Sequence, residues 1–224
     1  MTDYKRRDFL KSGAALAALS GAGAAGVLLP AALAQAQSAA GKIRVGLMLP
    51  YTGTFAQLGV AIENGFRLAL AEQGGKFGGR ELEFFKVDDE SNPPMAPENA
   101  NKLVQRDKVD VVIGTVHSGV AMGMAKVIRE SGTLWINPNA GADEVTGPLC
   151  APNIFRTSFS NWQTTHALGK VLKAKGHKNA VFITWKYAAG EEMMQGFKEG
   201  FEKEGGKLTK ELYTPFQQVE FQAL

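Results

Sequence analysis

Short β-like runs alternate with amphipathic helical stretches along this chain from Lys42 onward, and this alternation limits the folds that are open to it. After the run Ile43–Leu49, apolar residues recur at steps of three and four over residues 58–70, which is the spacing of one helix face. The Val- and Ile-rich run at 109–113 is typical of a strand covered on both faces of a parallel sheet. The repeated β-α-β order predicts an α/β fold with doubly wound parallel sheets and right-handed crossovers.

The alternation restarts after a stretch rich in Gly and Pro at residues 141–152, which predicts two lobes. We expect residues 42–150 to form the first lobe and residues 151–224 part of a second, with the extended run 154–157 opening the second lobe. That lobe would hold only about three strands, which is few for a sheet wound on both faces. Residues 221–224 resemble the opening of a further helix, so we expect a fragment or a truncated reading frame with an incomplete second lobe.

Residues 1–34 have the pattern of an export signal. Arg6 and Arg7, followed by Phe-Leu-Lys, resemble a twin-arginine signal, and the next stretch is rich in Ala and Gly rather than Leu. Small residues at alternate positions predict cleavage near Ala34 or Ala36. A membrane anchor is the alternative, but a stable span needs ~20 predominantly apolar residues, and Ser, Gly and Pro interrupt this stretch. The sequence therefore predicts a periplasmic protein with the twin-arginine export machinery as a partner.

The charge and the metal-binding residue types exclude other classes of partner. The chain carries 25 Lys and Arg against 22 Asp and Glu, and without residues 1–34 these numbers become 21 and 20. Such a balance lacks the basic footprint of a nucleic-acid-binding protein. With one Cys and three His, the sequence predicts no disulfide-rich scaffold, no metal site and no cofactor. Cys150 is either a small buried residue or a cysteine without its disulfide partner.

The loops that follow the predicted strands are the candidate ligand site, because ligands of open parallel sheets bind outside the carboxyl ends of the strands. The loop after residues 109–113 leads to Ser118 at a helix start, where unpaired N–H groups attract a carboxylate. Ser118 can instead be only the N-cap of that helix, and the spacing leaves both roles open. Trp185 and Tyr187 follow a later strand, where they either present flat faces to a ligand or pack against a helix.

Motifs of catalysis and of phosphate binding are weak or absent. His117 and Ser118 are adjacent and therefore poorly placed to reach each other, and there is no G-x-S-x-G elbow. Neither a P-loop nor a dinucleotide-binding glycine pattern is present. The consecutive acidic residues 88–90 end a strand, where successive side chains diverge, so they favour a solvated turn over a metal site. The sequence therefore predicts a binding protein rather than an enzyme.

Several short segments resemble, in order and spacing, the leucine/isoleucine/valine-binding group of periplasmic binding proteins of ABC importers. They include Thr52-Gly53, Gln57-Leu58-Gly59, Asp88-Asp89, Val112-Ile113-Gly114, Ser118 and Asn137-Pro138. The resemblance covers residues 42–224. It implies two lobes of the type I periplasmic binding protein fold that close on a small-molecule solute and deliver it to an ABC permease in the inner membrane. It also implies that further lobe residues follow Leu224.

The resemblance also implies which residues hold the solute. In the first lobe, the implied residues bind the carboxylate and ammonium of the solute or line the pocket for its side chain. They stand at the positions of Ser118, Asn139, Ala140, Gly141 and Leu58. In the second lobe the implied contacts lie around Trp185, Tyr187 and Ala189.

This sequence departs from the family pattern at the solute site. A Thr often found at the position of Gly141 is missing, and Asn139 replaces a small residue. Ser91 and His117 stand where the family has its first-lobe disulfide. We therefore expect a solute-binding component for a branched-chain-like amino acid or a related small carboxylate, aromatic acid or amide. The alternatives are a ligand-sensing receptor domain of the same fold and an exported enzyme.

Overall fold

The computed structural model describes residues 41–217 of the chain. The predicted export signal of residues 1–34, both predicted cleavage positions and residues 221–224 lie outside the described residues. Within the described part, no helix combines the length and the apolar character that are needed to cross a membrane.

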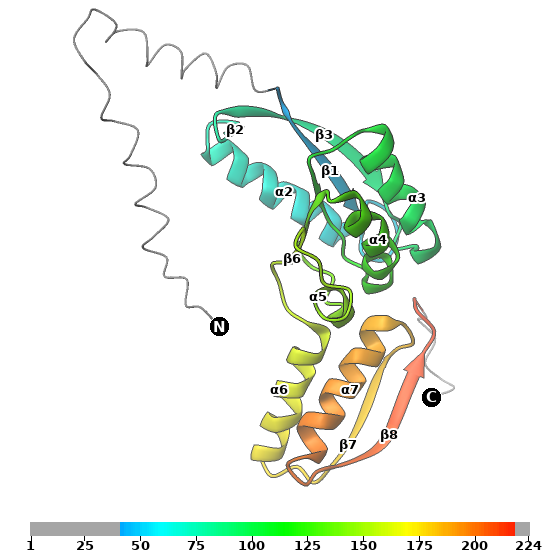
Figure 1. Ribbon diagram of the computed structural model, residues 1–224. Coiled ribbons are helices and arrows are strands. Elements are labelled where there is room, and N and C mark those ends of the chain that lie inside the picture. The colour runs from blue at the N-terminus through cyan, green and yellow to red at the C-terminus, as the bar shows by residue number, and fades with distance from the viewer. Residues whose placement is uncertain (1–40, 218–224) are drawn as a thin grey trace, which may run out of the picture. The chain divides into compact units, whose positions relative to one another are not determined.

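A mainly parallel sheet forms the first lobe, with the strand order β2-β3-β1-β4-β5-β6. Its strands are β1 (Ile43–Leu49), β2 (Lys76–Phe77), β3 (Arg80–Asp88), β4 (Val111–Ile113), β5 (Leu134–Asn137) and β6 (Ile154–Arg156). The short strand β2 pairs with β3 in the antiparallel sense, and the remaining neighbours are parallel. Because β1, β4 and β5 are parallel neighbours, the loops that follow them meet at one edge of the sheet (Figure 1).

Helices cover both faces of this sheet, as the doubly wound prediction requires. They are α2 (Ala56–Glu72), α3 (Ala96–Asn101), α4 (Ser118–Ser131) and α5 (Asp143–Thr146), with the short turns η1 (Pro93–Met95) and η2 (Lys102–Arg106) around α3. Alternate residues of β1 point to opposite faces, as strand geometry dictates. Met48 packs in the larger core with Met124 of α4 and Trp135 of β5, whereas Leu47 packs on the other face beside Phe66 of α2. The α/β prediction is confirmed.

Strand β6 belongs to the first sheet rather than to the second lobe. Ile154 and Phe155 pair in parallel with Trp135 and Ile136 of β5, and the Trp135 N–H donates to the carbonyl of Asn153. This pairing differs from our expectation that residues 154–157 open the second lobe. Gly and Pro composition marks where a chain turns, but it does not tell to which sheet the next strand returns.

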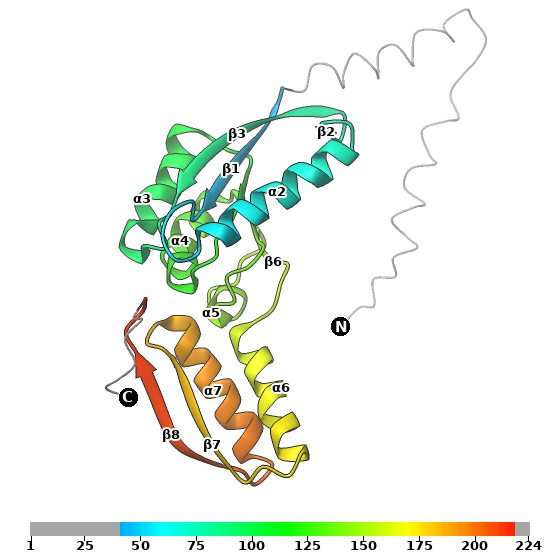
Figure 2. The same cartoon turned by 180° about the vertical axis from the view of Figure 1, so that it is seen from behind.

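The second lobe contains a parallel pair of strands, β7 (Asn179–Trp185) and β8 (Lys207–Thr214), and two helices, α6 (Asn161–Ala174) and α7 (Ala188–Glu202). Figures 1 and 2 show α7 lying between α6 and the strands. A capping box starts α6, in which the Ser160 hydroxyl accepts from the Gln163 N–H and the Gln163 side chain accepts from the Ser160 N–H. The rings of Phe182 and Phe197 pack β7 against α7.

The opposite face of β7 carries exposed apolar side chains in the described part of the chain. Val181 is 54% exposed and Ile183 is 52% exposed. A parallel sheet is normally covered on both faces. The pattern agrees with the predicted incomplete second lobe.

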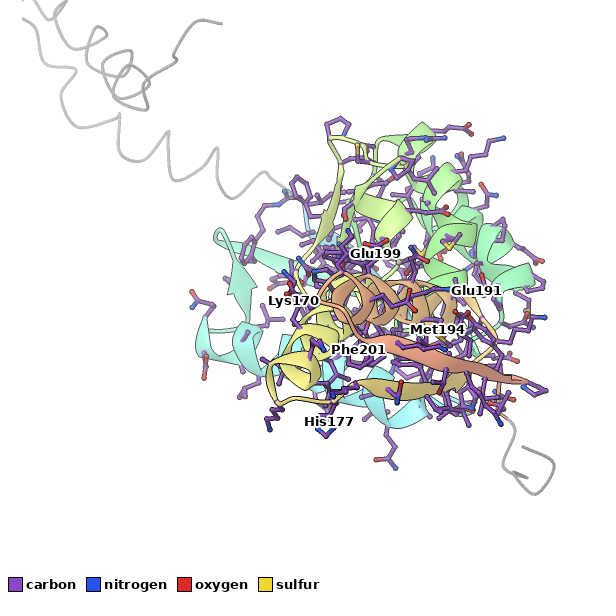
Figure 3. The ribbon with its side chains drawn as sticks, turned by 90° about the horizontal axis from the view of Figure 1, so that it is seen from below. Lys170, His177, Glu191, Met194, Glu199 and Phe201 are labelled. Carbon is purple, nitrogen blue, oxygen red and sulfur yellow. The ribbon has the colours of Figure 1, made fainter. Side chains whose placement is uncertain are left out.

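Glycines bring α6 and α7 unusually close together. A Cβ at Gly200 would lie 2.1 Å from the carbonyl oxygen of His166, and a Cβ at Gly196 would lie 2.5 Å from that of Trp162. The third such residue, Gly169 of α6, would meet the backbone of α7 at 2.7 Å. Figure 3 looks onto these helices from below, with Phe201 labelled on α7. Since the obstacles are backbone atoms, any side chain at these positions must separate the helices.

We expect Gly200→Ala to lower the free energy of unfolding by about 1–3 kcal/mol or more, because overpacking against backbone forces the helices apart. The matched control is Gly65→Ala in α2, where nothing lies within 4 Å of the added Cβ. That change should be neutral or slightly stabilising, since Ala favours a helix over Gly. Urea unfolding followed by circular dichroism measures both effects. Equal stability of the two variants would contradict the close contact between the helices.

Candidate functional site

His117, rather than Ser118, caps helix α4. The Nδ1 atom of His117 accepts from the N–H of Gly119 at 3.0 Å and from that of Val120 at 3.3 Å. Two of the N–H groups that we expected to face a carboxylate are therefore already paired. The alternative that Ser118 is only an N-cap is wrong, because Ser118 is the first residue inside the helix.

Ser118 instead faces the second lobe. Its hydroxyl oxygen lies 3.1 Å from Nδ2 of Asn161, the first residue of α6. Both side chains are buried, at 2% exposure each. The same Asn161 nitrogen donates to Glu192 of α7 at 2.6 Å, and the other oxygen of Glu192 accepts from the N–H of Asp143 at 2.9 Å. These hydrogen bonds connect the first lobe to the second at the edge where the strands end.

The loop after β5 folds back on itself and holds its residues beside Ser118. Asn137 Nδ2 donates to the carbonyl of Ala140 at 2.8 Å, and the Ala140 N–H donates to the carbonyl of Thr115 at 3.0 Å. The carbonyl of Gly141 accepts from the N–H of Asn161 at 2.9 Å. Ala140 is buried, its backbone is bonded to Asn137 and Thr115, and it does not line the cavity that Ser118 lines, so it supports the site without forming its wall.

A cavity of about 140 Å³ lies between the loops of the two lobes. Six of the predicted site residues line it, namely Leu58, Ser118, Asn139, Gly141, Tyr187 and Ala189. Five further residues line it that the sequence analysis missed, namely Phe55, Val116, Phe159, Asn161 and Met193. Asn161 is the first residue of α6, and Phe55 and Phe159 lie in loops just before helices, so proximity to an element end was the available indication. The roles of all these residues in binding stay predictions.

Trp185 lies beside this cavity rather than in its wall. It lines a neighbouring cavity of about 430 Å³ together with Phe55 and Tyr187. Phe216 joins this aromatic group, with its ring centroid 5.2 Å from that of Trp185 and 5.0 Å from that of Tyr187. His117 completes the group, 4.9 Å from Tyr187. The two lobes thus meet through aromatic side chains next to the polar contact at Ser118.

The wall of the smaller cavity contains no charged side chain among the described residues. Its polar members Ser118, Asn139 and Asn161 are neutral, and the remaining members are apolar or aromatic. Within residues 41–217, no group of three or more His, Cys, Asp or Glu residues could hold a metal ion. The chemistry that this site offers is therefore hydrogen bonding and apolar contact.

Three other residues named in the sequence analysis, Asp88, Asp89 and Cys150, lie outside the cavity wall. Asp88 and Asp89 accept backbone N–H groups, from Tyr51 and Ser91 respectively, so both carboxylates hold backbone. The predicted solvated turn is wrong for Asp89, which is 1% exposed and also accepts from the Thr115 hydroxyl. Cys150 is exposed, so the interpretation of this residue as a buried small side chain is wrong.

Burial lowers the pKa of His117 to about 4. The ring is 3% exposed and packs among aromatic side chains. Its capping role also requires the neutral form, because a protonated Nδ1 cannot accept a hydrogen bond. Folding therefore opposes protonation of His117.

We expect His117 to make stability depend on pH. The unfolded side chain titrates near its ordinary pKa of about 6.5, so the stabilisation is complete above that pH. It falls as the pH drops toward about 4, by at most about 1.4 kcal/mol per pH unit. His117→Asn keeps a capping side chain and should flatten this dependence, whereas the exposed His177→Asn should not. Urea unfolding between pH 4 and 8 tests this, and equal slopes for both variants would refute it.

Comparison with known proteins agrees with this architecture. The family model described as periplasmic binding protein matches residues 42–224. A Leu/Ile/Val-binding protein of Rhizobium johnstonii is 34% identical over 173 residues, which cover 76% of this chain and 47% of that protein. Leu/Ile/Val-binding protein homolog 6 of Brucella abortus is 26% identical over 190 residues, covering 84% and 48%. This chain spans about half the length of these relatives.

Solved structures give the same answer. A solute-binding protein of an ABC transporter from R. palustris, in complex with benzoate, is 55% identical with a TM-score of 0.80, covering 82% of this chain and 51% of that one. A solute-binding protein from Rhodopseudomonas palustris BisB5, in complex with 3,4-dihydroxy benzoic acid, is 30% identical with a TM-score of 0.73, covering 78% and 47%. With the family match over almost all described residues, the resemblance in the sequence is confirmed, and the chain belongs to the periplasmic binding protein family.

Proposed function

We propose that this protein is the solute-binding component of an ABC importer, and that its solute is a small aromatic monocarboxylate such as benzoate. It acts by capture and release without catalysis. The observation that carries the proposal is the chemistry of the cavity wall, which combines neutral hydrogen-bonding groups with aromatic and apolar side chains.

The polar groups suit a carboxylate better than an amino acid. Ser118 and the amide of Asn139 offer hydrogen-bond donors, and a donor to a charged acceptor forms the stronger class of hydrogen bond. A zwitterionic amino acid also brings an ammonium group, which needs an anionic or carbonyl partner when it is buried. No carboxylate lines the cavity within the described residues. The lack of a carboxylate in the wall narrows the range of solutes that the sequence predicted. It favours an aromatic acid over the branched-chain-like amino acid that headed that range.

The apolar part of the wall suits one aromatic ring. Phe55, Phe159 and Tyr187 provide flat faces, and aromatic rings attract one another in offset or edge-to-face contacts. The cavity volume of about 140 Å³ is close to the ~150 Å³ of an engineered apolar cavity that binds benzene. The benzoate and 3,4-dihydroxy benzoic acid complexes of the two similar solute-binding proteins support the same ligand class.

Binding and lobe closure are coupled in this proposal. The cavity draws Ser118 and Asn139 from the first lobe and Asn161 and Tyr187 from the second, so a ligand between them stabilises the closed arrangement. The closed form is the state that an ABC permease in the inner membrane would recognise. We place the protein in the periplasm. Export through the twin-arginine machinery stays a prediction from residues 1–34.

Isothermal titration calorimetry of the purified protein tests the ligand class. We expect saturable binding of benzoate and no measurable binding of leucine at the same concentrations, because the described cavity wall offers the ammonium group of leucine no anionic partner. Leucine binding with benzoate inactive would overturn the proposed ligand class.

Ser118→Ala should weaken benzoate binding by about 1.5–3 kcal/mol, the contribution of a hydrogen bond to a charged group. The matched control is Ser131→Ala at the other end of α4, where the hydroxyl bonds only to Ile128 and to Thr133. That variant should bind benzoate like the unmodified protein. Equal affinities of the two variants would remove Ser118 from the binding role.

A further inference from the structure

A half-buried carboxylate next to the cavity wall ends a chain of hydrogen bonds that leads to Ser118. Glu192 is half-buried in the first turns of α7 and does not line the cavity. Its Oε1 atom accepts from the Asp143 N–H at 2.9 Å, and its Oε2 atom accepts from Asn161 Nδ2 at 2.6 Å. The same nitrogen lies 3.1 Å from the Ser118 hydroxyl oxygen.

These contacts fix which way the Asn161 amide faces. An ionised carboxylate only accepts hydrogen bonds, so the NH₂ group of Asn161 must face Glu192. That nitrogen has two hydrogens, of which one goes to Glu192 and the other to Ser118. Since the amide nitrogen cannot accept, the Ser118 oxygen is the acceptor in its contact with Asn161. The hydrogen of the Ser118 hydroxyl is left free to donate elsewhere.

Gly141 makes this arrangement possible. A Cβ at that position would lie 2.3 Å from Oδ1 of Asn161 and 2.8 Å from its Cγ. The amide therefore fills the volume in which a side chain at position 141 would begin. The Asn161 N–H also donates to the Gly141 carbonyl, which holds the start of α6 against the loop. A side chain at 141 and the Asn161 amide exclude each other.

We propose that Glu192 is a positioning residue for the ligand, which orients the Asn161 amide and thereby makes the Ser118 hydroxyl a hydrogen-bond donor to the ligand's carboxylate. This inference rests on the proposed function, because it takes the carboxylate of the ligand to lie at Ser118. A donor hydroxyl favours a carboxylate over an amide of the same shape. The carboxylate accepts at both oxygens, whereas the amide also brings an NH₂ group that needs an acceptor.

Glu192→Gln should reverse the orientation of the Asn161 amide, because the hydrogen-bonding groups around it allow only one arrangement. The Asp143 N–H still requires an acceptor, so the carbonyl oxygen of the new side chain faces it and the NH₂ group faces Asn161. Two NH₂ groups cannot bond to each other, and Asn161 must therefore flip and present Oδ1 to both neighbours. The Ser118 hydroxyl then donates to that oxygen and turns its lone pairs toward the ligand. Benzoate then loses the Ser118 hydroxyl as a hydrogen-bond donor, and the NH₂ group of benzamide gains the same hydroxyl as an acceptor.

The experiment compares the affinities of benzoate and benzamide for the unmodified protein and for E192Q by calorimetry. The two probes share one shape, so packing changes cancel in the ratio of their affinities. Burial, followed by the charges of Asp143 and Glu144, raises the pKa of Glu192 against the opposing hydrogen bonds from Asn161 and Asp143. The titrations are therefore run at pH 8 rather than at a lower pH, because a higher pH favours the ionised carboxylate. We expect the ratio of benzoate to benzamide affinity to fall about tenfold or more in E192Q.

The control variant is Glu191→Gln, which removes the same charge from the neighbouring, exposed position of α7 (Figure 3). Simple electrostatics predicts that removing a negative charge strengthens the binding of an anion. E191Q should therefore leave the ratio unchanged or raise it, whereas E192Q should lower it. The opposite signs separate positioning from a charge effect.

A ratio in E192Q that equals or exceeds that of the unmodified protein overturns the proposal. If E192Q does not fold, Asn161→Ala replaces it, since removing the amide frees the Ser118 hydroxyl and must also lower the ratio. An unchanged ratio in N161A would then refute the positioning chain. If the unmodified protein binds neither probe, the proposed function itself has failed. Benzoate binding with an unaltered ratio in the variants would leave that function standing and refute only this inference.

Discussion

The hydrogen bond between Ser118 and Asn161 is the contact on which the arrangement of the site depends. It joins the first turn of α4 in the first lobe to the first residue of α6 in the second. Both side chains are buried, so each must find a partner within the protein. His117 takes over the capping of α4, which leaves the Ser118 side chain for this contact, and Gly141 leaves the space that the Asn161 amide fills. The polar contact between Ser118 and Asn161 thus constrains two neighbouring positions, 117 and 141.

Apolar and polar interactions have different roles at the junction of the lobes. The aromatic group of Phe55, His117, Tyr187 and Phe216 supplies contact area without direction. The hydrogen bonds through Asn161 supply direction and leave little freedom in how the lobe edges face each other. In the proposed role, a ligand that enters between the lobe edges meets polar groups that are already held in place by these hydrogen bonds. Such preorganisation reduces the entropy that binding must offset.

The sequence predicted the fold well because the apolar spacing of its helices and the apolar runs of its strands are both clear. The helix spacing after Leu58 and the Val/Ile run at 109–113 depend on local patterns, and both elements exist. The loops after parallel strands also predicted the place of the site correctly, since the sheet topology brings Leu58, Ser118 and Asn139 to one cavity. What failed depends on contacts between distant residues. The pairing of β6 with β5, the cap at His117 and the part played by Asn161 all involve partners that no local pattern names.

The glycine contact between α6 and α7 bears on how such a receptor changes during evolution. Because the two backbones touch, neither helix tolerates a bulkier residue at the contact or a shift along its partner. Asn161 and Met193 therefore enter the ligand cavity from a rigid frame. In the proposed role, substitutions that change the ligand preference and leave the frame intact lie in the rim of the cavity, at helix starts and in the loops that end the strands. A bulkier residue in the frame must separate the helices, whereas one in the rim alters the cavity and leaves the frame in place.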